Sequence, residues 1–289
     1  MDIKITDFSK YAICRKYYSG SERKVGIKIK DEEYILKFQK ETSFGLRFNH
    51  ISEYLGSQIF QLLSISVQET YLGIYKGEQV VACKNFIPND AIFVPFNDVC
   101  ESTLDNDKNL YTYEYETIMQ MLEDNSKLEN LDETVKAFWD MYIVDALIAN
   151  FDRHGTNWGF LKYKNRYKMA PIFDNGSSLY PQLVDEDEML KTINSEEETN
   201  KRVFKFPTSQ IKMNGNKSSY YDVISSLRYP ECNEALIRIM NKTDFDSINN
   251  LINNTPFITE IHKDLYKHLL KARYEKILEA SYLKLRHIV

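Results

Sequence analysis

Three side-chain oxygen donors in one short stretch of the sequence constrain the fold more than any other feature. Asp152 is followed by Asn157 five residues later, and Asp174 comes seventeen residues after that Asn. Apolar residues precede both motifs, at positions 143–149 and 170–173. Apolar segments of this kind belong inside a protein, so they indicate a buried scaffold that delivers the polar side chains to a cleft.

Phosphoryl transfer is a reaction that needs such a set. A carboxylate orients or deprotonates the attacking hydroxyl, and oxygen ligands hold the metal ions that bridge the nucleotide phosphates. Asp152 and Asn157, on one tight loop, can supply a base and a metal ligand side by side. Asp174, after a return of hairpin length, completes the metal site with a hard oxygen donor. Each residue alone is a common turn former, but the three together indicate a phosphotransferase.

The composition is that of a packed globular protein. With 289 residues, 43% of them hydrophobic, the chain can bury a substantial core in one large domain or two lobes. The net charge of −5 argues against direct nucleic-acid binding. No apolar run approaches the length of a membrane-spanning helix, and the N-terminus is too polar for a secretory signal. The four cysteines are scattered, which indicates neither disulfides nor a zinc site. We therefore expect a soluble cytoplasmic protein without a membrane partner.

The first third of the chain alternates apolar and polar residues in short segments separated by turn-forming residues, which is typical of β-strands. A helix is predicted over residues 49–63, where Ile51, Leu55 and Ile59 belong to an apolar stripe. The predicted strands cover residues 11–14, 25–30, 33–38, 69–74 and 79–85.

A lysine and a glutamate in this region suggest a phosphate-binding site. Lys37 interrupts the apolar end of a predicted strand, and Glu53 lies near the start of the predicted helix that follows. A strand lysine that pairs with a helix glutamate forms the nucleotide-phosphate half of a kinase-type site. The turn before that strand contains no G-x-G-x-x-G motif, but its small and basic residues are predicted to cover the phosphates. These residues are Ser19, Gly20, Ser21 and Lys24.

Residues 86–90 break the β pattern and are predicted to form a hinge, with Phe86 beside the nucleotide. The hinge divides the chain into a β-rich N-lobe, residues 1–87, and a helical C-lobe, residues 88–289. The expected fold class is therefore α+β, with the two lobes of a protein-kinase-like fold.

Beyond the hinge, most of the chain has helical periodicity. Residues 97–109 are polar and are predicted to form a loop, and residues 185–198 contain seven acidic residues and are predicted to be a solvated, mobile segment. Helices are predicted over residues 111–123, 132–149 and 263–285 and from residue 220 onward.

With these motifs identified, the chain resembles the HipA-like serine/threonine kinases of bacterial toxin–antitoxin operons, above all the compact members of the HipT and CtkA type. The resemblance extends from about residue 12 to residue 285. It is most specific in the segments N-F-D-R-H-G-T-N-W-G-F-L and A-P-I-F-D-N-G-S-S-L. The strand Y-I-L-K-F and the helix I-S-E-Y-L-G-S-Q-I-F support it.

The resemblance implies a role for each residue that matches the family motifs. It implies that ATP and Mg²⁺ are the cofactors and that Asp152 is the catalytic base, with Asn157 and Asp174 as metal ligands. Lys37 would contact the nucleotide phosphates, and Glu53 would hold Lys37.

Two neighbouring positions in the same motifs have a less definite meaning. The resemblance places His154 either at a phosphate of the nucleotide or in a bracing role within its loop. Asn175 stands where ordinary kinases have the Phe of D-F-G, so the aromatic switch of those kinases is missing.

The resemblance also implies partners. The substrate would be a protein, in related toxins an aminoacyl-tRNA synthetase, and the kinase would phosphorylate itself at Ser19 or Ser21. About eleven residues precede the first predicted strand, so the N-terminal subdomain of HipA is expected to be absent. An antitoxin or a small partner protein would then supply it. A secreted effector that acts inside a host cell is an alternative.

Three other functions are compatible with the same motifs. Phosphoinositide kinases share D-R-H-x-x-N and the fold, but they need a basic loop for the anionic headgroup, whereas residues 185–198 are acidic. A small-molecule phosphotransferase is a second alternative. A nucleotide-binding pseudokinase is the third, and the complete set of kinase-type residues argues against it.

Overall fold

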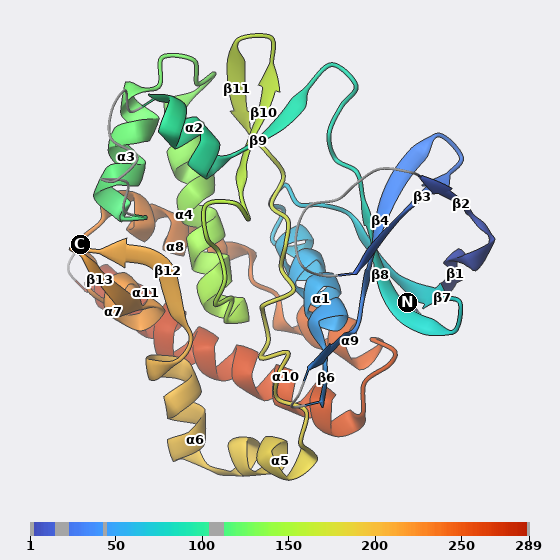
Figure 1. Cartoon of the computed structure of the whole chain (residues 1–289). Coiled ribbons are helices and arrows are strands. Elements are labelled where there is room, and N and C mark those ends of the chain that lie inside the picture. Colours follow the sequence, from blue (N-terminus) through green and yellow to red (C-terminus); the bar gives the residue numbers. More distant parts are fainter. Residues whose placement is uncertain (1–2, 15–22, 43–44, 104–112, 288–289) are drawn as a thin grey trace.

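Six strands from the first third of the chain form one curled sheet, in the order β1-β7-β8-β4-β3-β2. This arrangement comes from a computed structural model, which describes residues 3–14, 23–42, 45–103 and 113–287. Figure 1 shows the sheet on one side of the molecule and most of the helices on the other. The strands are β1 (Thr6–Asp7), β2 (Ala12–Cys14), β3 (Lys24–Ile29), β4 (Glu32–Phe38), β7 (Thr70–Tyr75) and β8 (Glu78–Lys84).

Strand β4 lies inside this sheet, antiparallel to both β3 and β8. Side chains alternate between the two faces of a strand, so Tyr34, Leu36 and Phe38 point to one face, where they belong to an apolar cluster. Lys37 points to the opposite face. The register aligns Lys37 with Val81 of β8 and with Lys24 of β3.

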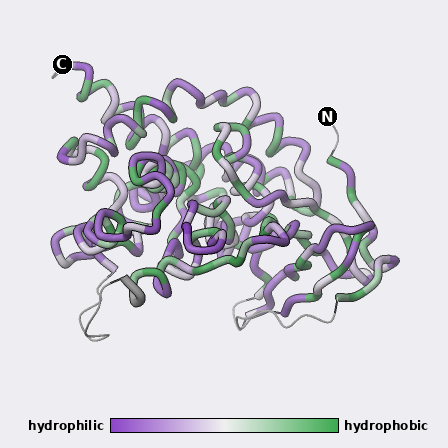
Figure 2. Tube along the Cα trace, turned by 90° about the horizontal axis from the view of Figure 1, so that it is seen from above, coloured by the Kyte–Doolittle hydropathy of each residue, from purple (hydrophilic) through white to green (hydrophobic). Residues whose placement is uncertain are grey.

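The face of the sheet that carries Lys37 is covered by helix α1 (Asn49–Leu62). Its residues Ile51, Leu55 and Ile59 are fully buried and pack with Val81 in the largest apolar cluster of the molecule. The same cluster continues into the helical part of the chain, so α1 connects the sheet to the helices. Along the helices in Figure 2, hydrophilic and hydrophobic residues alternate, as expected where each helix turns one face to the core.

Helix α4 (Leu131–Ile148) is the central helix of the second part. Asn130 caps its N-terminus by accepting a hydrogen bond from the Glu133 amide, and Ala149 ends it in the left-handed region at φ 57°. The chain then forms a loop and the hairpin of β10 (Gly159–Tyr163) and β11 (Arg166–Met169), which β9 (Ile92–Pro95) extends to three strands. A second loop follows β11. The loop that carries Asp152 and the loop that carries Asp174 therefore flank one hairpin.

The remaining elements surround this centre. The helices are α2 (Phe96–Thr103), α3 (Tyr115–Asp124), α5 (Glu186–Asn194), α6 (Glu196–Asn200), α7 (Tyr220–Ser225), α8 (Pro230–Lys242), α9 (Phe245–Asn253), α10 (Glu260–Arg273) and α11 (Ala280–Arg286). A 3₁₀ turn, η1 (Phe8–Lys10), and two π-helical stretches, η2 (Lys201–Lys205) and η3 (Tyr274–Glu279), also occur. Two small hairpins are formed by β5 (Lys40–Thr42) with β6 (Gly45–Arg47) and by β12 (Thr208–Met213) with β13 (Asn216–Ser219).

The predicted strands of the first third are all present, and so are the predicted helices, with shifted ends. The long helix expected over residues 263–285 is α10, η3 and α11 in succession. The helix expected over residues 111–123 begins at Tyr115, and residues 111–112 lie outside the described residues. The β12–β13 hairpin has no counterpart among the predictions.

Two predicted irregular segments are wrong. The loop expected over residues 97–109 is helix α2 up to Thr103, and residues 104–109 lie outside the described residues. Apolar residues of α2 are fully buried, which outweighs the polar composition of the segment.

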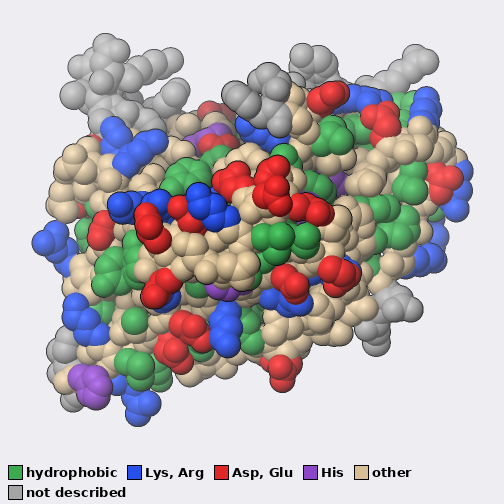
Figure 3. All heavy atoms as spheres, turned by 90° about the horizontal axis from the view of Figure 1, so that it is seen from below, with side chains coloured by type: hydrophobic (Ala, Val, Ile, Leu, Met, Phe, Trp, Pro, Cys, Tyr) green, Lys and Arg blue, Asp and Glu red, His purple; other side chains and the backbone are tan. Residues whose placement is uncertain are grey.

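The acidic segment 185–198 also differs from its prediction, because it forms α5 and α6. Asp185 and Ser195 cap these helices, and acidic residues occupy the first turns, where the helix dipole favours negative charge. Arg202 pairs with Glu188 at 2.9 Å. Figure 3 shows this face, with acidic side chains interspersed with Lys and Arg.

The six-stranded sheet ends with β8 at Lys84, and the next strand begins at Ile92. The predicted division into residues 1–87 and 88–289 remains a prediction. Within the described ranges, no helix has the length and apolarity required to cross a membrane.

Candidate active site

The predicted phosphate-site residues lie together. The Nζ atom of Lys37 is 3.0 Å from Oε2 of Glu53 and 2.9 Å from Oδ1 of Asp174. Lys37 comes from β4, Glu53 from α1 and Asp174 from the loop after β11. The Glu53 side chain is 1% exposed and that of Asp174 is 41% exposed. One carboxylate is therefore structural, and the other faces solvent.

The three charges shift one another's proton affinities. Burial alone would lower the pKa of Lys37, but Asp174 and Glu53 raise it well above its ordinary value. Burial would raise the pKa of Asp174, but the Lys37 ammonium more than offsets this and the pKa is lowered. For Glu53, burial dominates and raises the pKa despite Lys37. The site thus keeps a cation beside an anionic, solvent-facing Asp174.

The loop between α4 and β10 presents Asp152, whose side chain is 43% exposed. The Nδ2 atom of Asn157 donates to the Asp152 carbonyl oxygen at 2.8 Å, which ties the two ends of the loop together. His154 Nε2 lies 3.8 Å from Oδ1 of Asp152. The Thr156 amide donates to Nδ1 of His154 at 3.3 Å. Because an amide can only donate, Nδ1 accepts, and Nε2 is the ring nitrogen that faces Asp152.

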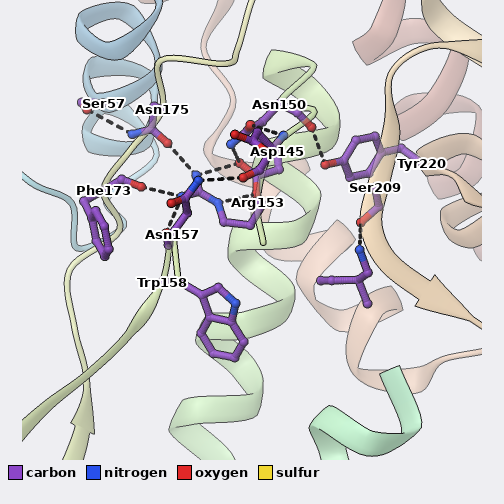
Figure 4. A network of polar contacts seen from close by, with 12 residues as sticks. Ser57, Asp145, Asn150, Arg153, Asn157, Trp158, Phe173, Asn175, Ser209 and Tyr220 are labelled. Atoms are coloured by element: carbon purple, nitrogen blue, oxygen red, sulfur yellow. Dashed lines mark hydrogen bonds and ion pairs between the residues drawn. The ribbon is translucent and has the colours of Figure 1, made fainter. Parts of the chain in front are cut away.

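Arg153, for which the sequence suggested no definite role, connects the two loops from a fully buried position (Figure 4). Its Nε and Nη2 atoms bind the Asp145 carboxylate at 2.8 and 3.0 Å. Nη1 donates to the carbonyl oxygens of Asn157 and Phe173, and Nη2 donates to Oδ1 of Asn175 at 2.6 Å. One guanidinium therefore sets the distance between the Asp152 loop and the Asp174 loop.

Asp145 is the sequence signal for this network. It is the one charged residue in the apolar run I-V-D-A-L-I-A of α4, and a buried carboxylate requires a cationic or hydrogen-bonding partner. Asn150 also donates to Asp145 at 2.9 Å, and the Tyr220 hydroxyl donates to the Asn150 carbonyl oxygen at 2.7 Å. The start of the Asp152 loop is thereby fixed to α4 and α7.

The structure places Phe86, predicted beside the nucleotide, against the residue before Asp174. Its ring centroid lies 5.5 Å from that of Phe173, and Phe93 lies 5.1 Å from Phe173 at 90°. Of the predicted phosphate-covering residues, Lys24 is aligned with Lys37 across β3 and β4. The other three, Ser19, Gly20 and Ser21, lie outside the described residues.

Asn157 and Asp174 are suited to Mg²⁺. The amide nitrogen of Asn157 is bound to its own loop, while Oδ1 has no hydrogen-bond partner in the described part of the chain. Asp174 uses only Oδ1 for Lys37. The described residues contain no cluster of three His, Cys, Asp or Glu side chains able to hold a metal. The donors on Asn157 and Asp174 suit Mg²⁺, which is commonly bound through one or two carboxylates together with substrate phosphates.

A strand lysine is held here by a helix glutamate and by an aspartate from the loop after β11, which is the arrangement expected of a kinase-type nucleotide site. The comparisons agree with it. The family described as the HipA-like C-terminal domain matches residues 17–273. The serine/threonine-protein kinase CtkA of Helicobacter pylori (strain J99) is 34% identical over 279 residues, which is 93% of this chain and 85% of that protein. The chain therefore belongs to the HipA-like family and is an enzyme of the serine/threonine protein kinase class.

Solved structures support the same assignment. The crystal structure of a Helicobacter pylori proinflammatory kinase CtkA matches with a TM-score of 0.91 and 33% identity, covering 99% of this chain and all of that one. HipA of Shewanella oneidensis MR-1, solved with HipB and operator DNA, matches with a TM-score of 0.56 and 14% identity over 86% of this chain and 60% of that chain. The second match supports the fold alone.

Proposed function

We propose that this HipA-type kinase uses ATP and Mg²⁺ to phosphorylate serine or threonine hydroxyls of a protein substrate and of itself. The observation that carries the proposal is the contact of Lys37 with both Glu53 and Asp174, at 3.0 and 2.9 Å. It combines a cation for the phosphates with an anion for the metal that accompanies them. An ammonium has three donors, so two carboxylate contacts leave one for a phosphate oxygen.

Asp152 is the proposed catalytic base. Its carboxylate is 43% exposed and thus accessible to an acceptor hydroxyl, and it would orient that hydroxyl and accept its proton. His154, whose Nδ1 accepts from Thr156 and whose Nε2 faces Asp152, would orient the Asp152 carboxylate, which favours the bracing role over a phosphate contact. Asn157 and Asp174 would hold Mg²⁺, which when bound neutralises charge on the nucleotide phosphates.

A polypeptide acceptor is supported by an exposed aromatic residue near the base. Phe206 is 45% exposed, although its amide and carbonyl groups are fixed by bonds to Lys201 and Tyr180. Its ring centroid lies 5.8 Å from that of Phe151, the residue before Asp152. These two rings would receive an apolar side chain of the substrate beside the acceptor hydroxyl.

The rival lipid substrate is less well supported. A phosphoinositide headgroup needs a basic surface near the site, whereas the segment after the Asp174 loop exposes Asp185, Glu186 and Asp187. An aminoacyl-tRNA synthetase, encountered in the cytoplasm, is the proposed protein substrate. A small protein that silences the kinase is the proposed partner, since the related HipA was solved with HipB.

The test is phosphate transfer from labelled ATP and Mg²⁺ by the purified chain, alone and with a whole-cell extract. We expect labelled protein, identified by mass spectrometry, with the parent chain and with the control variant Asp187→Ala on exposed α5. Asp152→Ala should label nothing. Label that appears only in lipid or in a small alcohol, with none in protein, would replace this proposal by one of its rivals.

A further inference from the structure

Asn175 joins the helix of the N-terminal part to the catalytic loop. Its side chain is fully buried, and it uses both ends of its amide, as Figure 4 shows. The Nδ2 atom donates to Oγ of Ser57 in α1 at 3.1 Å, and Oδ1 accepts from Nη2 of Arg153 at 2.6 Å. In the sequence, Ser57 lies 118 positions before Asn175 and Arg153 lies 22 positions before it.

The same segment contacts α1 at two further points. The backbone amide of Asn175 lies close enough to the Glu53 carboxylate to lower its pKa, against the larger effect of burial. A Cβ atom on Gly56 would lie 2.7 Å from Cβ of Asn175, which is closer than real Cβ contacts. Helix α1 therefore approaches this loop as closely as the absence of a side chain at Gly56 permits. Glu53, Gly56 and Ser57 form one continuous contact with Asn175.

Asp174, the residue before Asn175, is held in an unusual conformation. Its φ is 60°, in the left-handed region that residues with a side chain seldom adopt. Such a conformation persists only where the surroundings over-determine it. The contacts of Asn175 and of Arg153 with the Phe173 carbonyl oxygen lie on both sides of Asp174, and they supply this constraint.

The geometry points to Asn175 and Ser57 as a polar clamp, that is, as positioning residues that set Glu53, and through it Lys37, relative to Asp174. The Phe of D-F-G acts through apolar contacts, which have no preferred direction. A buried amide instead requires its partners at fixed angles, and losing one leaves an unsatisfied polar group. Helix α1 cannot move outward without breaking the Ser57 and Glu53 contacts together. The clamp thus keeps the nucleotide site assembled before ATP binds.

This inference rests on the proposed function for its kinetic part, so the test starts from nucleotide binding. Ser57→Ala removes the α1 end of the clamp and leaves the bond between Asn175 and Arg153. Ser52→Ala is the matched control, because Ser52 is buried in the same helix and its Oγ has no hydrogen-bond partner in the described residues. The affinity for ATP with Mg²⁺ is measured by calorimetry, and phosphorylation of casein gives kcat.

We expect Ser57→Ala to weaken ATP binding and lower kcat by about two- to tenfold each, as for a lost hydrogen bond that lowers the population of the competent state. Ser52→Ala should match the parent. In the background of Glu53→Gln, Ser57→Ala should have little further effect on ATP affinity, because the clamp acts through Glu53. If Ser57 only stabilised the fold, Ser57→Ala would lower Tm, and its effect on ATP affinity would be the same with Glu53 or Gln at position 53.

Two results would overturn the clamp: equal ATP affinities of Ser57→Ala and Ser52→Ala, or losses for Ser57→Ala and Glu53→Gln that multiply independently. Asn175→Ala, which removes both ends, is the second variant and should exceed Ser57→Ala in effect. If the parent phosphorylates no protein, the proposed function fails, but the binding measurements still decide the clamp.

Discussion

The Nζ atom of Lys37 lies 3.0 Å from the carboxylate of Glu53, and this contact joins a sheet strand to the helix that covers it. Glu53 is buried, so it has no access to water that would compensate for the loss of Lys37. The pair therefore holds the lysine side chain in place without a nucleotide. The site is organised by protein contacts, and this leads to predictions that separate stability from function.

Replacing Lys37 by Met should affect both properties. ATP affinity should fall at least tenfold, because the phosphates lose their strand cation. The free energy of unfolding should fall by about 3 kcal/mol, because a buried charge loses its partner. Urea unfolding and calorimetry measure the two effects. The double variant Lys37→Met/Glu53→Gln should regain most of the stability and none of the ATP affinity. Parental ATP affinity in either variant would show that Lys37 does not bind the nucleotide phosphates.

Asp152→Asn keeps the shape of the side chain and removes its charge. Phosphate transfer should decrease on the order of 10³-fold, as for other removals of a positioned catalytic charge. ATP affinity and Tm should match the parent, because the side chain is half exposed and its backbone contacts remain. Single-turnover kinetics with labelled ATP measure the rate. Transfer near the parental rate would remove Asp152 from the role of base.

Asp174→Ala should differ from Asp152→Asn in its dependence on metal. We expect ATP binding to become weak and nearly insensitive to Mg²⁺. Asp152→Asn should keep the parental Mg²⁺ dependence, because Asp174 is a proposed metal ligand and Asp152 is not. Titrations of ATP with and without EDTA compare them. Equal Mg²⁺ dependence of the two variants would contradict the assignment.

His50 should make the protein sensitive to mild acid. Burial lowers the pKa of His50 from 6.5 to about 4. Between these two pH values, His50 is protonated in the unfolded chain and neutral in the folded chain. Stability from this residue is complete above pH 6.5 and decreases as the pH falls toward 4. The loss between pH 7.5 and 5 should be about 2 kcal/mol. His50→Gln should flatten the pH profile of urea unfolding, and exposed His287→Gln should not. Parallel profiles for both variants would refute this.

Autophosphorylation remains a prediction from the sequence, at Ser19 or Ser21. A phosphoserine carries about −1.5 to −2 charges at neutral pH, so it would repel the ATP phosphates and compete for Lys37. We expect slow modification and weaker ATP binding by the modified protein. Peptide mass spectra after incubation with ATP, with Asp152→Ala as control, test the first part. Full ATP affinity of a Ser19→Asp/Ser21→Asp variant would contradict the second.

Local patterns in the sequence were sufficient for the elements that build the site. Alternation at residues 33–38 indicates a strand with Lys37 on one face, and the stripe of Ile51, Leu55 and Ile59 indicates the helix of Glu53. Both patterns are direct consequences of burial along a single element, which has period 2 in a strand and 3.6 in a helix. The polar composition of α2 and the acidic composition of α5 and α6 wrongly predicted irregular segments. In these helices, capping and packing outweighed composition.

The sequence by itself determined which oxygen and nitrogen groups are available for the chemistry and in what order they occur. Only the tertiary structure decided how they pair. Lys37 and Asp174 are 137 residues apart and lie 2.9 Å from each other, and Arg153 binds both loops from inside the core. A buried polar side chain leaves no periodic pattern in the sequence. Its partner depends on which distant segments of the chain pack against it in the folded protein. In the sequence, Arg153 and Asn175 are only the residues that follow Asp152 and Asp174. The three-dimensional packing makes them the connection between the two loops.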